Sequence, residues 1–202
     1  MGEVILIIAN VLSFIGNSLF TLSAILKSKR KILLFQSSNH VLAIVAEFLT
    51  KAYSGMVQEG VSLIRNTIFL FVKTEKKIIK LIISLACMAL AVTLGILFNI
   101  WFSEGVWYGY LPTIGGFIYS TFVILAFMLN INELRAEFIL KIGLALNSIC
   151  WGVYGYFVML YPIMIFNAIN FVLCIVSFVR IYITVKKIKE VENKTEIEEI
   201  SE

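Results

Sequence analysis

Seven long apolar stretches, separated by short polar loops, are the feature that most constrains the fold of this sequence. A transmembrane helix needs roughly 20 mainly apolar residues, and each stretch reaches or nearly reaches that length. The chain has 202 residues, of which 60% are hydrophobic and 15% are charged, and a soluble fold of this size could not bury so much apolar surface. We therefore expect an all-α integral membrane protein with spans at Glu3–Leu26, Ile32–Ala52, Met56–Val72, Ile78–Phe102, Tyr110–Asn130, Phe138–Met159 and Ile163–Thr184.

Basic residues gather in every second loop, and this alternation predicts how the spans are oriented. Lysine and arginine residues follow the first, third, fifth and seventh spans, whereas the opposite loops carry only Lys51, together with the acidic Glu104. Because basic loops stay in the cytoplasm, we expect the N-terminus outside and the C-terminus in the cytoplasm. An even number of spans would break the alternation.

Apart from Lys80 at its start, the fourth stretch, residues 78–102, has one strongly polar side chain, Asn99, and it divides the other six into two sets of three. Both sets cross the membrane in the same order, so we expect two parallel three-helix bundles joined by a linker helix. The predicted domains are a first bundle at 3–73, the linker transmembrane helix at 78–102, a second bundle at 110–185 and a charged, partly disordered cytoplasmic tail at 186–202.

Two registers compete for aligning the second set of helices on the first. A shift of 108 positions pairs Asn39 with Asn147 and Tyr53 with Tyr161. A shift of 104 positions instead pairs an asparagine at 66 with one at 170. The sequence leaves both registers open.

Polar side chains form a stripe along each expected helix except the fourth. In the first span they recur every three or four residues, which is one face of a helix: Asn10, Ser13, Asn17 and Thr21. Such groups either hydrogen-bond between membrane helices or line a path for a polar ligand. Two amides one turn apart, Asn167 and Asn170, exceed what packing requires and favour the ligand interpretation for that pair.

Charged residues within the spans are costly unless they find partners. Arg65 lies near the middle of the third span, and we predict that it pairs with Glu47 of the second span, with Glu59 as the competing partner. The pair could be structural or could couple transport. It could also form a proton or substrate relay with His40, a residue type that titrates near physiological pH.

The sequence has no motif for nucleotide, metal or hydrolytic chemistry. A phosphate-binding loop, an HExxH sequence and a CxxC pair are all missing. The cysteines stand singly in apolar stretches, at Cys87, Cys150 and Cys174, and do not predict a disulfide or a metal site. We expect no enzyme activity, catalytic residue, metal, cofactor or nucleic-acid partner. The expected partners are the lipid bilayer and a small-molecule substrate, and a homo-oligomer is compatible with the sequence.

Several short segments carry a resemblance to a known family. They are KSKRK at 27–31, AYSG at 52–55, LIRN at 63–66, NSICWGVYG at 147–155 and NAIN at 167–170. On these segments the chain resembles the SWEET/PQ-loop transporters and, more closely, the YgjV-type bacterial inner membrane proteins. The resemblance implies a three-one-three helix architecture, alternating access and a place in the bacterial inner membrane.

The resemblance also implies a substrate site. In the SWEET-like group, asparagines and a tryptophan on the third and second helices of each triplet line the pocket, which implicates Asn66, Trp151 and Asn170 here. With Asn167 added from its polar stripe, these side chains would bind a neutral polar metabolite, such as a sugar or nucleoside, by hydrogen bonding and stacking. The alternative is a non-transporting membrane scaffold or an accessory subunit.

Overall fold

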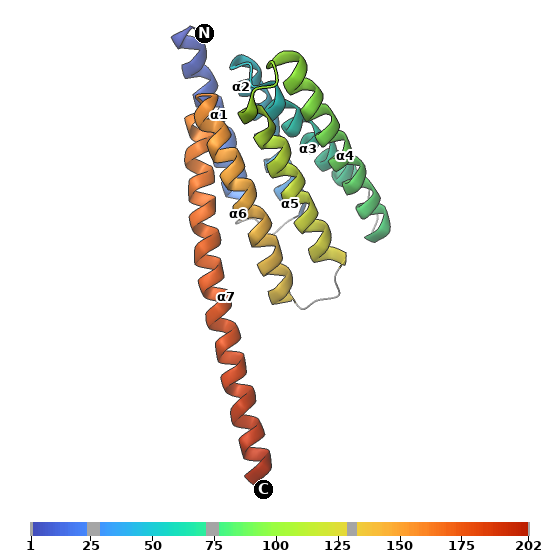
Figure 1. Ribbon diagram of the computed structural model, residues 1–202, viewed down its shortest axis with the longest axis vertical. Coiled ribbons are helices and arrows are strands. Elements are labelled where there is room, and N and C mark those ends of the chain that lie inside the picture. The colour runs from blue at the N-terminus through green and yellow to red at the C-terminus, as the bar shows by residue number, and fades with distance from the viewer. Residues whose placement is uncertain (1, 24–28, 72–76, 129–132, 202) are drawn as a thin grey trace.

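The computed structural model describes residues 2–23, 29–71, 77–128 and 133–201, and this part of the chain is all helical (Figure 1). Its elements are α1 (Glu3–Ser23), α2 (Lys29–Leu49), α3 (Tyr53–Phe71), α4 (Lys77–Phe102), the short 3-10 helix η1 (Trp107–Tyr110), α5 (Leu111–Met128), α6 (Glu133–Phe157) and α7 (Tyr161–Ser201). Each predicted span corresponds to one α-helix. The residues expected at the ends of spans one, three and five (24–26, 72, 129 and 130) lie outside the described part.

Five of these helices are long and apolar enough to cross a membrane, with spans at Glu3–Leu22, Ile78–Phe102, Trp107–Ala126, Leu134–Phe157 and Tyr161–Lys186. The chain is therefore a multi-pass membrane protein by the length and composition of its helices. In α2 the apolar part is shorter, Leu33–Leu49, because the helix opens on Lys29, Arg30 and Lys31. In α3 the polar residues Gln58, Glu59 and Arg65 interrupt the apolar run.

The last helix is longer than the sequence predicts. We expected a partly disordered tail from residue 186, but α7 continues as a helix to Ser201, and Figure 1 shows it extending well beyond the other helices. The segment has no glycine or proline, and it is rich in lysine, glutamate and isoleucine, which tolerate or favour helix. The structure thus has a helix over residues for which the sequence favoured a partly disordered end.

Consecutive helices pack against one another along the whole chain, so that each lies antiparallel to the next (Figure 1). Two further contacts join distant segments: α1 packs against α7, and α3 packs against α5. These contacts correspond to each other, because each joins the first helix of one set of three to the last helix of the other set.

The turns that follow α2 and α6 have the same backbone structure. In the α2–α3 turn (residues 50–52), Lys51 has φ +58° and the Ala52 N–H donates to the carbonyl of Glu47 over 2.7 Å. In the α6–α7 turn (residues 158–160), Met159 has φ +61° and the Leu160 N–H donates to the carbonyl of Gly155 over 2.9 Å. Each position in the second turn is 108 higher than its counterpart in the first.

The structure favours the register of 108 over that of 104 at these turns. The helices that follow begin at Tyr53 and Tyr161, the pair that this register predicts. The hydrogen-bond pattern is the Schellman motif, in which one left-handed residue satisfies the last carbonyl groups of a helix. The second pair predicted by this register also has matching surroundings, because Asn39 faces a glycine of α1 and Asn147 faces a glycine of α5.

The Gly–Asn contacts show how closely these helices approach. A Cβ atom at Gly16 would lie 2.9 Å from Oδ1 of Asn39, and a Cβ atom at Gly115 would lie 2.9 Å from Oδ1 of Asn147. Glycine is needed at both positions because any side chain would push the two helices apart. The same pair of residue types thus closes the α1–α2 and α5–α6 interfaces.

Candidate functional site

A polar cleft of about 300 Å³ lies at the end of the molecule where the α2–α3 and α6–α7 turns meet. Both turns line it, together with the end of α4 and the 3-10 helix η1. Its lining residues are Thr50, Lys51, Ala52, Ser54, Phe102, Ser103, Val106, Tyr108, Gly109, Tyr154, Phe157, Val158 and Met159. We refer to it as the turn cleft. A ligand there would contact segments that are about a hundred residues apart in the sequence.

Tyr154 of α6 joins the two halves of the turn cleft. Its side chain is 1% exposed, its hydroxyl donates to the carbonyl of Ala52 over 3.0 Å and it accepts from the Gly55 N–H over 3.1 Å. The Gly55 N–H lies in the first turn of α3, where N–H groups have no partner within the helix. The Ala52 carbonyl also accepts from the Met56 N–H over 3.1 Å. A residue of the second set of helices therefore completes the α2–α3 turn of the first set.

Glu47 lies directly behind the lining of the turn cleft. It is fully buried, and neither of its carboxyl oxygens has a hydrogen-bond partner within the described structure. A Cβ atom at Gly55 would lie 2.6 Å from Oε1 of Glu47 and 2.8 Å from the hydroxyl oxygen of Tyr154. An ionised carboxylate costs several kcal/mol in such a place without a partner. A buried acid with no structural bond marks a candidate binding group.

The predicted pair between Glu47 and Arg65 is not formed. Glu47 stands two residues before the end of α2 and Arg65 stands twelve residues after the start of α3, which places them about 15 Å apart along the helix axes. The prediction ended the second helix at residue 52 and started the third helix at residue 56, each three residues later than observed, and so placed the two side chains too close in depth. Glu59 is not the partner of Arg65 either, because its carboxylate bonds Nδ1 of His40.

The hydrogen bond between His40 and Glu59 joins α2 to α3 at a depth that the register of the two helices explains. His40 stands nine residues before the end of α2 and Glu59 six residues after the start of α3, so the two lie within about 5 Å in depth. The pair is mostly buried. The predicted relay joined His40 to Glu47 and Arg65; the structure instead bonds His40 to Glu59 and leaves Glu47 nearer the turn.

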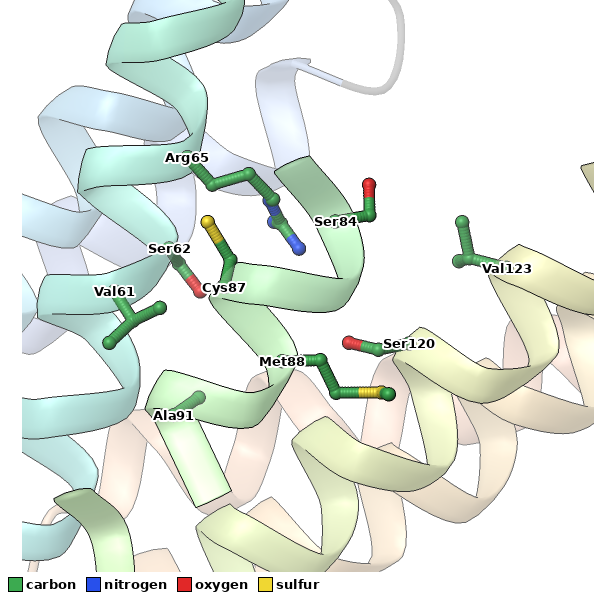
Figure 2. Close-up of a pocket in the computed structure, with 9 residues that line it drawn as sticks. All are labelled: Val61, Ser62, Arg65, Ser84, Cys87, Met88, Ala91, Ser120 and Val123. Carbon is green, nitrogen blue, oxygen red and sulfur yellow. The ribbon is translucent and has the colours of Figure 1, made fainter. Parts of the chain in front are cut away.

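Arg65 lines a separate, smaller cavity of about 50 Å³ between α3, α4 and α5. Figure 2 shows its guanidinium extending towards α4, with the hydroxyl groups of Ser62 and Ser120 directed into the same space. We call this space the Arg65 cavity. Nearer the start of α3, Gln58 donates to the carbonyl of Ala91 over 2.8 Å and to the hydroxyl of Thr113 over 3.1 Å. These bonds connect α3 to α4 and α5.

The four residues predicted to bind substrate line neither the turn cleft nor the Arg65 cavity. Asn66 is 2% exposed and its Nδ2 has no partner in the described structure. Asn167 donates to the carbonyl of Ile163 in its own helix over 2.8 Å, and Asn170 is half-buried. Trp151 packs beside the buried core formed by Ala9, Ala46, Leu160 and Ile163. Their role in binding stays a prediction.

Several residues in and beside the turn cleft and the Arg65 cavity were not predicted from the sequence. Ser54 and Gly55 were noted only as part of a resembling segment, Tyr154 only as part of such a segment and of a polar stripe, and Gln58 not at all. A signal was present for Gln58, because an amide inside an apolar stretch needs a partner. For Tyr154 no sequence signal identifies the partner, because the α2–α3 turn is about a hundred positions away.

Comparison of the chain with protein-family models, with curated protein sequences and with solved structures gave no match.

Proposed function

We propose that this chain is a membrane transporter that carries a neutral polar metabolite, such as a sugar or nucleoside, by alternating access. In this proposal α1–α3 and α5–α7 are two parallel three-helix bundles, α4 is the linker, and all seven helices cross a bacterial inner membrane with the N-terminus outside. The observation that carries the proposal is the turn cleft. It lies where equivalent turns of the two bundles meet, so a ligand there would contact both bundles, as ligands do in transporters built from repeats, here at the membrane-surface end of the interface.

The lining of the turn cleft suits a ligand that carries hydroxyl groups. Thr50, Ser54 and Tyr108 supply hydrogen-bonding groups, while Phe102 and Phe157 supply aromatic surface. A small-molecule site usually has an apolar wall and a few polar groups that converge on the ligand. Trp107, Tyr108 and Phe157 also form an aromatic cluster at this end, with ring centroids 4.9–5.9 Å apart, as expected where a helix bundle meets the membrane surface.

The proposal is tested by replacing Glu47 with glutamine and measuring stability and uptake on the same protein. Glutamine has the shape of glutamate without its charge, so the thermal unfolding temperature in detergent should stay equal or rise, because functional groups are held at the expense of stability. Uptake of labelled sugars and nucleosides into liposomes should fall at least about tenfold. Glu104→Gln is the matched control, because Glu104 is exposed at the same end, and it should change neither quantity.

A non-transporting scaffold or accessory subunit is the second candidate, and one observation favours it. The side chains of Asn10, Tyr154 and Gln58 all hydrogen-bond between distant segments, so much of the polar stripe serves packing. Under this alternative, wild-type protein would show no uptake and no ligand-dependent rise in unfolding temperature across a broad metabolite panel. Such a result, with Glu47→Gln more stable than wild type, would replace the transporter proposal with the scaffold.

A further inference from the structure

The Arg65 cavity contains a cation at the level of the membrane-spanning helices. Of its lining residues, Ser84 and Cys87 belong to the span Ile78–Phe102, and Ser120 belongs to the span Trp107–Ala126. Arg65 itself lies about 18 Å from the start of α3 and about 9 Å from its end. A guanidinium at this depth needs a negative partner, because arginine stays protonated in proteins and a charge in hydrocarbon is costly.

No carboxylate in the described part of the chain supplies that partner. The helices that form the rest of the cavity wall, α4 and α5, contain no aspartate or glutamate. On α3 the one acidic residue is Glu59, and it is bonded to His40. Glu47 lies about 15 Å away in depth, behind the turn cleft.

The groups around the guanidinium are neutral donors. Ser62, Ser84 and Ser120 contribute hydroxyl groups to the lining and Cys87 contributes a thiol, and Figure 2 shows the hydroxyls of Ser62 and Ser120 facing the space that Arg65 enters. A positive charge with several hydroxyl donors and no acid is the composition of an anion site. The cavity of about 50 Å³ has room for a species of one or two water molecules in size.

We propose that the Arg65 cavity binds one small inorganic anion of the size of chloride, which neutralises the guanidinium between α3, α4 and α5. This site is separate from the turn cleft and does not depend on the proposed transport function. The same chemistry is offered by the phosphate of an anionic lipid, reached from the membrane, so the experiment compares the two sources directly.

The test is equilibrium dialysis of radiolabelled chloride against the full-length protein, purified in neutral detergent and stripped of lipid. Wild type should bind one chloride saturably, and Arg65→Gln should weaken binding at least about tenfold because the charged donor is lost. Ser120→Ala keeps the charge and removes one hydroxyl, and should weaken binding about fivefold. Arg30→Gln, which removes an exposed arginine at the start of α2, should bind as wild type does.

Three results would overturn the proposal. They are a lack of saturable chloride binding by wild type, unchanged binding by Arg65→Gln, and a rise in unfolding temperature that phosphatidylglycerol produces and chloride does not. The last result would assign the cavity to a lipid phosphate. If Arg65→Gln fails to fold, Ser120→Ala and Arg65→Lys decide the matter. Weaker binding in both supports the anion site, and unchanged affinity in both contradicts it.

Discussion

The α2–α3 turn and the α6–α7 turn have one backbone structure and opposite side-chain environments. Around the first turn stand Glu47, Ser54 and Gly55, and around the second, at the equivalent positions 108 residues later, stand Gly155, Pro162 and Ile163. Both turns line the cleft, but the buried side chain beside the first turn is the acidic Glu47, whereas Leu160 and Ile163 beside the second turn belong to the buried apolar core. The two turns therefore share one backbone structure, while the residues around them differ in polarity.

Each turn is also held by a side chain from the other set of helices. Tyr154 of α6 bonds the α2–α3 turn, while Asn10 of α1 donates to the carbonyl of Met159 and accepts from the Tyr161 N–H, both over 3.0 Å. The two bonding groups differ. A buried tyrosine hydroxyl bonds the α2–α3 turn, and the amide of a half-buried asparagine bonds the α6–α7 turn. These hydrogen bonds connect the two sets of helices at both turns.

Of the substitutions considered, Gly55→Ala should have the largest effect on stability, because its methyl group would occupy the space between Glu47 and Tyr154 beside the α2–α3 turn. Its new Cβ atom would fall 2.6 Å from Oε1 of Glu47 and 2.8 Å from the Tyr154 hydroxyl, and overpacking of this kind costs about 2–3 kcal/mol. The unfolding free energy in detergent measures it.

Gly60→Ala on the same helix is the matched control for Gly55→Ala. Nothing lies within 4 Å of a Cβ atom at Gly60, so this change should be neutral or stabilise the helix by about 0.5–1 kcal/mol. Equal effects of the two substitutions would contradict the close packing of Gly55 against Glu47 and Tyr154.

Tyr154→Phe should follow, with a loss of about 1–2 kcal/mol. Without the phenol hydroxyl the Gly55 N–H would remain buried without its partner, and an unsatisfied buried group carries its full desolvation cost. The Ala52 carbonyl would keep its bond from the Met56 N–H. The experiment compares unfolding free energies with those of Tyr156→Phe, in which the altered ring is 58% exposed. A Tyr154→Phe protein as stable as the Tyr156→Phe protein would show that the α2–α3 turn does not need the second set of helices.

The sequence predicted the helices well because each apolar stretch is long enough to require internal hydrogen bonding. It predicted side-chain partners poorly, and the cause is geometric. The error over Glu47 and Arg65 came from placing both the end of the second helix and the start of the third helix three residues late, since every residue shifts depth by about 1.5 Å. The bonds of Asn10 and Tyr154 join segments 99–151 positions apart, and helix periodicity identifies a polar face without identifying what it meets.

Asn10→Ala should cost about 1 kcal/mol, because it removes one acceptor and one donor from the apolar turn and resembles the loss of a helix cap. The control is Asn17→Ala, whose amide donates to the carbonyl and hydroxyl of Ser13 in its own helix and should cost only a few tenths of that. Thermal unfolding of both variants in one detergent gives the ranking. The reverse ranking would mean that the α1 contact with the α6–α7 turn contributes little.

Lys51→Gly and Met159→Gly should have the smallest effects, and both should be stabilising. Each residue has a left-handed backbone, with φ +58° and +61°, which a side chain disfavours by about 1 kcal/mol relative to glycine. Both side chains are exposed, so their removal costs little packing, and the two gains should agree within about 0.5 kcal/mol. Unfolding free energies of the single variants and of the double variant measure this directly. Equal and additive gains in unfolding free energy are expected if the two turns have the same backbone structure and the same local energetics. Unequal gains would mean that the surroundings of the two turns change the energetic cost of the left-handed residue. The turns would then be alike in backbone geometry but not in energy.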